Sequence, residues 1–105
     1  MAIKKNFSSF EDLIANSKIP VLVTFYTTGC SYCQMLSPIL EQVKTQMGDR
    51  LKIVKINTAN YPKLASKYEV KVSPTTLLFV DGELASRIKG VMQAPQLMQY
   101  IQKFL

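Results

Sequence analysis

The sequence predicts an α/β fold, a three-layer α/β/α sandwich with a mixed central sheet of four to five strands between helices. The chain has 105 residues, the length of one domain, so we expect 1–105 to fold as a single domain. A nearly continuous apolar run over 19–26 is typical of a strand that is buried on both faces. Strand–helix–strand units, followed by a hairpin signal, favour a mixed sheet covered by helices.

The first half of the chain is predicted to hold two helices around the strand at 19–26. Ser8-Ser9-Phe10-Glu11 fits a capping box, so a short helix should begin there. From Cys30 onward, apolar residues recur at steps of three and four, which indicates a helix that Gly48 ends. Pro38 falls inside this helix and should kink it. A short strand near 3–7 would supply the fifth strand of the sheet.

The second half is predicted to alternate strands and helices and to close with a hairpin. Asp81-Gly82 is a strong signal for a two-residue hairpin turn. The predicted elements are strands over 51–57 and 75–80, a helix over 59–68, a return strand that ends near Lys89, and a final helix over 93–105.

The composition excludes several kinds of chemistry. The chain has no His and two Cys. Without His there is no Ser-His-Asp or Cys-His relay, and two Cys cannot close a four-Cys zinc site within one chain. No apolar run approaches the roughly 20 residues that a membrane span needs. No apolar export segment follows the basic start, so a cytoplasmic location is expected, or an organelle matrix if a transit peptide has been removed.

Cys30-Ser31-Tyr32-Cys33 stands where the predicted strand passes into a helix. A helix N-terminus carries about half a positive charge and unpaired N–H donors, and both stabilise a thiolate. Cys30 is therefore the expected nucleophile in disulfide exchange, and Cys33, one turn further on, is close enough to attack a mixed disulfide formed there. Two alternatives stay open, namely a pair of buried core cysteines and a metal site completed by a dimer or by other ligands.

Three segments resemble the thioredoxin family in the right order and spacing. The stretch 25–38, FYTTGCSYCQMLSP, looks like the active-site segment of thioredoxins, and 72–79, VSPTTLLF, resembles the family's cis-proline strand. Asp81-Gly82-Glu83 followed by Lys89-Gly90 resembles the closing hairpin and its glycine. The resemblance covers about 7–105. It implies a thioredoxin-like fold and a protein-disulfide oxidoreductase that needs no bound cofactor and no metal.

The resemblance also implies roles for single residues. Cys30 would be the attacking cysteine and Cys33 the resolving one. The residues alone favour an ordinary trans proline at Pro74, whereas the resemblance implies a cis bond that packs against the disulfide. The positions implied to bind an extended substrate peptide are Gly29, Ser31, Tyr32, Ser73, Pro74 and Gly90.

Three replacements distinguish the active-site segment from the Trp-Cys-Gly-Pro-Cys of typical thioredoxins. Gly29 replaces the Trp, Ser31 the Gly and Tyr32 the Pro. Without that proline, the backbone keeps one more N–H near Cys30, and an added donor to sulfur would stabilise the thiolate and hence the reduced state. We therefore predict a more oxidising protein than a standard thioredoxin.

Thr24 stands six residues before Cys30, where thioredoxins usually carry a buried acid that helps to deprotonate the resolving thiol. Threonine cannot act as that base, so resolution at Cys33 is predicted to be slow, with water as the proton acceptor. Lys55 matches the family's lysine partner of that acid. Without the carboxylate it should lose its charge more readily or turn to solvent, and an ordinary exposed strand lysine is the alternative.

The excess positive charge is concentrated in one segment. The chain carries a net charge of +6, and 50–71 holds six basic residues and one acidic residue. This segment is either a solvated face or a surface that steers an acidic protein partner. No long basic run indicates nucleic acid. The expected partners of the monomer are disulfide-containing proteins and, as electron donor, a thioredoxin reductase or glutathione.

A Cys-x-Tyr-Cys pair also resembles glutaredoxins. In that family glutathione binds near the cysteines, and some members hold an iron–sulfur cluster between two subunits. The alternative functions are therefore a glutathione-linked or cluster-holding protein, or a thioredoxin fold that binds partners without turnover. Reduction of insulin disulfides with dithiothreitol and visible absorbance would separate these possibilities.

Overall fold

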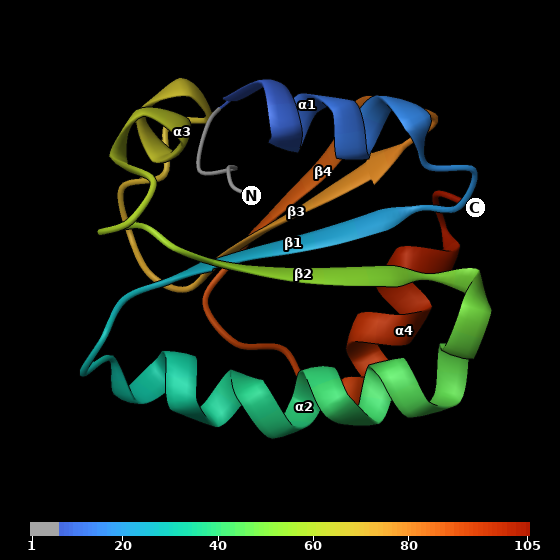
Figure 1. Ribbon diagram of the computed structural model, residues 1–105. Helices are drawn as coiled ribbons and strands as arrows, with labels where there is room; N and C mark the ends of the chain where they lie inside the picture. Colours follow the sequence, from blue (N-terminus) through green and yellow to red (C-terminus); the bar gives the residue numbers. More distant parts are fainter. Residues whose placement is uncertain (1–6) are drawn as a thin grey trace.

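Residues 7–105 are described by a computed structural model, in which helices and strands alternate along the chain (Figure 1). The predicted strand near 3–7 lies outside the described residues, apart from Phe7, which belongs to the first helix. The elements are α1 (Phe7–Asn16), β1 (Val21–Tyr26), α2 (Ser31–Met47), the 3-10 helix η1 (Gly48–Arg50), β2 (Lys52–Asn57), α3 (Pro62–Lys67), β3 (Thr75–Val80), β4 (Glu83–Lys89) and α4 (Ala94–Gln102).

The described strands form one mixed sheet in the order β2-β1-β3-β4. β1 runs parallel to β2 and antiparallel to β3, and β3 and β4 form the predicted hairpin. Asp81 and Gly82 form the turn of this hairpin with φ of 54° and 81°. Positive φ at both central residues is what a type I′ turn requires, and it matches the twist of the two strands.

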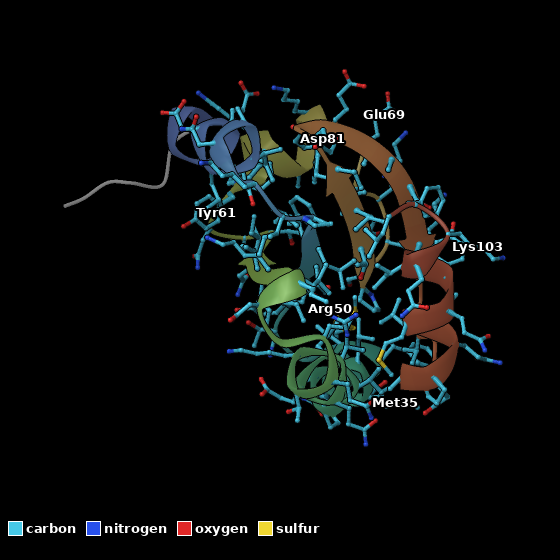
Figure 2. The ribbon with its side chains drawn as sticks, turned by 90° about the vertical axis from the view of Figure 1, so that its right-hand side faces the viewer. Met35, Arg50, Tyr61, Glu69, Asp81 and Lys103 are labelled. Atoms are coloured by element: carbon cyan, nitrogen blue, oxygen red, sulfur yellow. A yellow bond between two sulfur atoms is a disulfide. The ribbon has the colours of Figure 1, made fainter. Side chains whose placement is uncertain are left out.

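Helices cover both faces of the sheet, as the buried run in β1 predicts. In Figure 1, α2 and α4 lie on one side of the sheet and α1 and α3 on the other. In Figure 2, turned by 90°, Met35 lies on the α2 side and Tyr61 on the α1 side. Every residue of 21–25 in β1 is buried. Because successive side chains of a strand point to opposite faces, β1 contributes to both hydrophobic layers.

Each face of the sheet has its own hydrophobic core. Leu22 and Leu78 pack with α2 and α4 in one core, whereas Phe25 and Phe79 belong to the other. In the second core the rings of Phe10, Tyr68 and Phe79 pack edge to face, with centroids 5.6–6.0 Å apart. Burial in this cluster raises the pKa of the Tyr68 phenol. The sheet is therefore held on both sides, and its strand ends are fixed in place for the site.

Three helix boundaries differ from the sequence-based expectation. α1 already includes Phe7, so Ser8 lies inside the helix and not at its cap. α3 begins at Pro62 and not near residue 59, because two turn hydrogen bonds, from the N–H of Asn60 to Asn57 O and from the N–H of Tyr61 to Thr58 O, precede it. α4 ends at Gln102. Within residues 7–105 no helix is long and apolar enough to cross a membrane.

Candidate active site

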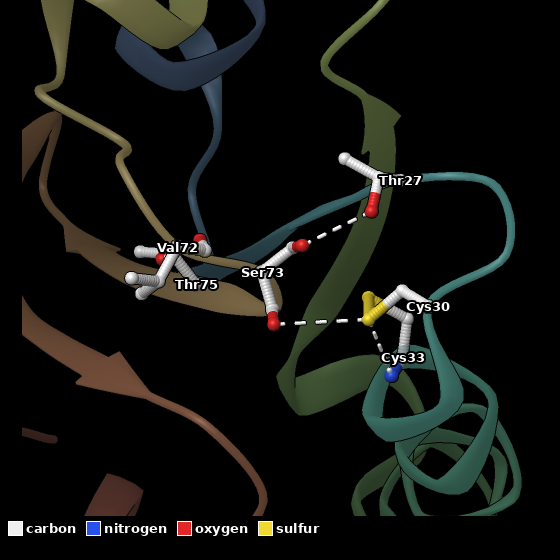
Figure 3. The surroundings of a disulfide bond; sticks show 6 residues. All are labelled: Thr27, Cys30, Cys33, Val72, Ser73 and Thr75. Atoms are coloured by element: carbon white, nitrogen blue, oxygen red, sulfur yellow. Dashed lines mark hydrogen bonds between the residues drawn. A yellow bond between two sulfur atoms is a disulfide. The ribbon is translucent and has the colours of Figure 1, made fainter.

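Cys30 and Cys33 form a disulfide at the start of α2 (Figure 3). Cys30 is the N-cap residue of the helix, with an extended backbone at φ −89° and ψ 113°, and Cys33 lies in the first turn. Their Cα atoms are 5.2 Å apart, and both side chains are half-buried. The redox pair predicted from the spacing is therefore present, and it lies at the surface end of the helix and not within either core.

Gly29 allows the chain to turn from β1 into α2. Its φ is +79°, in the left-handed region that side chains rarely adopt. A Cβ added here would meet no atom within 4 Å, so the backbone conformation and not crowding favours glycine. At the position where typical thioredoxins carry a tryptophan, this chain therefore has no side chain.

The sulfur of Cys30 lies between a donor and an acceptor. The backbone N–H of Cys33 donates to Cys30 Sγ at 3.1 Å, and the carbonyl oxygen of Ser73 lies 3.7 Å from the same sulfur (Figure 3). A disulfide sulfur carries no proton, so the second approach becomes a hydrogen bond only when Cys30 is a thiol. The N–H favours the thiolate, whereas the carbonyl oxygen favours the thiol.

The predicted extra donor is not the one that bonds to the sulfur here. Among the hydrogen bonds of the described residues, the N–H that reaches Cys30 Sγ is that of Cys33, not that of Tyr32. The Tyr32 side chain is 60% exposed beside the disulfide. Ser31 is exposed as well. Both residues between the cysteines therefore present their side chains to whatever approaches the sulfur.

The peptide bond between Ser73 and Pro74 is cis, the isomer that the family resemblance implies. Pro74 is buried immediately before β3, and its carbonyl oxygen accepts the N–H of Gly90 at 2.9 Å. The end of β4 is thereby tied to the loop that faces Cys30. The structure thus brings Ser73, Pro74 and Gly90, which are distant in sequence from the cysteines, to the same end of the sheet.

A pair of hydroxyl groups that the sequence analysis missed holds this loop against β1. Thr27 Oγ1 and Ser73 Oγ are 3.0 Å apart, and both residues are half-buried (Figure 3). The hydroxyl of Thr75 also donates to the carbonyl oxygen of Val72 at 2.6 Å. The antiparallel register of β1 and β3 could have pointed to Thr27. In that register Thr24 pairs with Thr76 and Phe25 with Thr75. Two residues further along each chain, Thr27 stands opposite Ser73.

Thr24 and Lys55 both lie near Cys33, and they face each other across the parallel pair of β1 and β2. Within residues 7–105 no hydrogen bond joins their side chains, which have other partners. Thr24 is buried, and its hydroxyl is 3.0 Å from that of Thr76. Lys55 is exposed, and its Nζ donates to Ser37 Oγ on α2 at 3.1 Å. This position fits a lysine that turns to solvent for want of a carboxylate partner, and it fits equally the alternative of an ordinary exposed strand lysine.

Thr24, Lys55 and Cys33 line one cavity of about 410 Å³ beside the disulfide. The other lining residues are Tyr26, Thr27, Thr28, Gly29, Gln34, Leu36, Ser37 and Leu40. Two large apolar side chains outside the cavity, Met35 and Val72, are also about half exposed near the active-site elements. Within residues 7–105 no group of three or more His, Cys, Asp and Glu side chains could hold a metal ion.

Comparisons with known proteins agree with the geometry. A family model described as Thioredoxin matches residues 1–103. The chain is 46% identical over 105 residues to a thioredoxin-like protein of Synechocystis sp., and the match covers both chains completely. It is also 46% identical over 104 residues to the chloroplastic thioredoxin Y1 of Arabidopsis thaliana, covering 99% of this chain and 60% of that relative.

A solved structure shows the same arrangement of elements. The oxidised form of mitochondrial thioredoxin 3 from Saccharomyces cerevisiae superposes with a TM-score of 0.85 at 28% identity. The superposition covers 95% of this chain and 92% of the yeast chain. The mixed sheet flanked by helices is therefore the fold of a solved protein that carries the same family name as the sequence relatives.

Proposed function

This chain belongs to the thioredoxin family, and from that premise we propose how its two cysteines work. It is a thiol–disulfide oxidoreductase with a Cys30–Cys33 redox pair. Its family implies disulfide-containing targets and a reductase-type electron donor in general terms. The observation that supports the finer proposal is the position of Cys30 at the N-cap of α2, with Cys33 in the first turn.

In the proposed cycle the protein starts as a dithiol. The Cys30 thiolate attacks one sulfur of a target disulfide, and the other target sulfur leaves as a thiolate and takes up a proton. Cys33 then loses its proton to water and attacks the Cys30 sulfur, which releases the second target sulfur as a thiolate. Two electrons have passed to the target, and the protein now carries the Cys30–Cys33 disulfide seen in the structure. A reductase or glutathione returns the electrons.

Two substitutions test the assignment of these roles. Cys30→Ser should abolish reduction of insulin disulfides with dithiothreitol as electron donor. Cys33→Ser should leave the first attack intact and accumulate a mixed disulfide with the target, visible as an increase in mass. Turnover that persists in Cys30→Ser would contradict the assignment. Visible absorbance in oxygen-protected protein would instead favour the cluster-holding alternative.

We propose that the pair is more oxidising than that of a standard thioredoxin. The support is the Cys-Ser-Tyr-Cys sequence, in which Tyr32 keeps the backbone N–H that a proline would remove. In the reduced form this N–H would add to the one that Cys33 already provides at 3.1 Å. Each donor stabilises the thiolate, and a stabilised reduced state raises the reduction potential.

Equilibration in defined thiol–disulfide buffers measures this potential. We expect a value near about −200 mV or above, against about −270 mV for a standard thioredoxin. Tyr32→Pro should lower the potential, whereas the neighbouring Ser31→Gly should change it less, because it removes no N–H. A wild-type value close to that of a standard thioredoxin would refute the proposal.

We further propose that resolution at Cys33 is slow because position 24 holds no acid. Thr24 is buried, lines the cavity beside Cys33, and has its hydroxyl occupied by Thr76. Thr24→Asp should therefore place a carboxylate where it can accept the Cys33 proton and speed turnover. Thr24→Asn is the matched control, because asparagine has nearly the same size as aspartate but its amide cannot accept the proton. An unchanged rate in Thr24→Asp would argue against this explanation.

An acidic protein partner is proposed for the basic segment 50–71. Lys63 and Lys71 are exposed in and after α3. Charges of this kind raise the association rate at low salt. The rate of exchange with an acidic target should therefore fall with ionic strength, and a Lys63→Gln/Lys71→Gln double variant should flatten that dependence. Replacement of Lys18 and Lys44, which lie outside the segment, should leave it unchanged.

We propose the cytoplasm as the working compartment. The support is that both cysteines of the chain belong to the redox pair and none is left for a structural disulfide, which is typical of proteins in a reducing compartment. Two relatives are described as chloroplastic, so an organelle matrix is the competing location. Cell fractionation followed by detection of the native protein decides between them.

A further inference from the structure

The cavity beside the disulfide has an unusual combination of walls. Cys33 contributes to it, together with the side chain of Lys55, whose Nζ is held 3.1 Å from Ser37 Oγ. Leu36 and Leu40 are buried residues of α2 that form part of its apolar wall. Lysine is thus the one charged residue among the lining residues, all of which the structure describes.

The chemistry at Cys33 requires a proton acceptor that this lining lacks. Cys33 must lose a proton before or while its sulfur attacks Cys30. The lining residues include no carboxylate and no imidazole. The hydroxyl of Thr24, which faces this region, is already paired with Thr76. Within the cavity, the acceptors left for the proton are therefore water and any solute that enters.

We propose that this cavity is a binding site for a small monocarboxylate anion, which accepts the Cys33 proton during resolution. The inference rests on the proposed resolving role of Cys33. The Lys55 ammonium supplies the charge that an anion needs, and the Ser37 hydroxyl supplies a hydrogen-bond donor beside it. A volume of about 410 Å³ exceeds the space of one water molecule, so an anion fits together with solvent.

The walls favour a carboxylate with a short alkyl group over a purely inorganic anion. The carboxylate would lie toward Lys55, and the alkyl group toward Leu36 and Leu40. The proton balance is simple. The carboxylate takes the proton of Cys33 and becomes the acid, the Cys33 sulfur bonds to the Cys30 sulfur, and the target sulfur leaves as a thiolate. The acid then returns its proton to the solvent, so the anion is not consumed.

The rate of resolution as a function of carboxylate concentration tests the proposal. Reaction of the dithiol protein with the aromatic disulfide DTNB releases one coloured thiolate on attack and a second on resolution. At about pH 6, where acetate is ionised, and at constant ionic strength set with chloride, acetate should raise the second rate about three-fold and saturate. Propionate, which has nearly the same basicity, should reach half-saturation at a lower concentration because its extra methyl group contacts the apolar wall.

Variants distinguish a site from catalysis by the bulk buffer. Lys55→Gln should remove the saturating response, whereas Lys44→Gln, the same charge change on the exposed side of α2, should keep it. Thr24→Asp should also remove it by supplying an attached carboxylate. A nuclear magnetic resonance titration with acetate should shift the amide signals of the cavity residues in the wild type and not in Lys55→Gln.

Two outcomes would overturn the inference. One is a rate that rises linearly and equally in the wild type and in Lys55→Gln, and the other is the absence of any acetate effect. Either result leaves insulin reduction in chloride buffer intact, so the proposed oxidoreductase cycle would stand. Loss of the second DTNB phase in every buffer would instead show that the resolving role of Cys33 is wrong.

Discussion

Two hydroxyl pairs, one within the strands and one just beyond their ends, join the chain of β1 to that of β3, and they differ in burial but not in oxygen–oxygen distance. Thr24 and Thr76 have their hydroxyl oxygens 3.0 Å apart and are each 3% exposed. Thr27 and Ser73 have the same oxygen–oxygen distance and are half-buried. Both pairs follow one antiparallel register, with the second lying two residues beyond the last backbone pair, Phe25↔Thr75.

The difference shows how one kind of contact can serve stability at one place and chemistry at another. A buried hydroxyl that loses its partner has no water to replace it, so the inner pair is costly to break. A half-buried hydroxyl can bond to water instead, so the outer pair contributes little free energy. What the outer pair does is hold Ser73 in position, with its carbonyl oxygen 3.7 Å from Cys30 Sγ.

The largest expected effect comes from breaking the inner pair on one side. Thr24→Val keeps the shape of the side chain but leaves the Thr76 hydroxyl buried without its partner. The free energy of unfolding of the disulfide form should fall by about 1–3 kcal/mol, measured by urea denaturation. The described residues contain no buried side-chain N or O atom without a partner, so the variant would create one. A loss below that range would mean that water reaches Thr76.

Removing both hydroxyls of the inner pair should restore most of the loss. In Thr24→Val/Thr76→Val no polar group is left unpaired, and two methyl groups meet across the strands. We expect the double variant to be within about 1 kcal/mol of the wild type, so the two single losses should not add. A double-mutant cycle by urea denaturation measures this coupling. Additive losses would show that the two hydroxyls act separately.

The sequence predicted the elements that depend on local pattern. The apolar run of β1 indicated a strand buried on both faces, and Asp81-Gly82 indicated the hairpin turn. The boundary of α3 was missed although Pro62, a residue favoured at the first helical position, marked it. The turn bonds that delay the helix involve backbone groups, and no side-chain pattern reports them.

The site was predictable to the extent that it is local. Cys30 and Cys33 lie within one helical turn, so their spacing alone indicated the pair. Thr27 and Ser73 are 46 positions apart, and they meet only because β1 and β3 pair in one register. The register depends on how two strands align across the sheet, which neither segment specifies by itself. The contact between Lys55 on β2 and Ser37 on α2 was missed because it depends on how the helix packs against the sheet, which neither segment specifies by itself.

A smaller effect on stability is expected at the outer pair. Thr27→Val removes the partner of a hydroxyl that solvent can still reach. The free energy of unfolding should fall by about 0.5 kcal/mol, less than in Thr24→Val under the same conditions. Ser73→Ala should give a similar loss, because both variants break one bond. A loss as large as that of Thr24→Val would remove the distinction between the two pairs.

The smallest effect in free energy should appear in the reactivity of Cys30. In the dithiol form the Ser73 carbonyl oxygen favours the Cys30 thiol, whereas the N–H of Cys33 favours its thiolate. Without the bond to Thr27, the Ser73 loop can move away from the sulfur. The fraction of Cys30 that is present as thiolate then increases. Alkylation of Cys30 by iodoacetamide at mildly acidic pH should therefore be about two-fold faster in Ser73→Ala and in Thr27→Val. Thr24→Val, which leaves the bond between Thr27 and Ser73 in place, should alkylate at the wild-type rate. Equal rates in all variants would mean that the outer pair does not position the carbonyl oxygen.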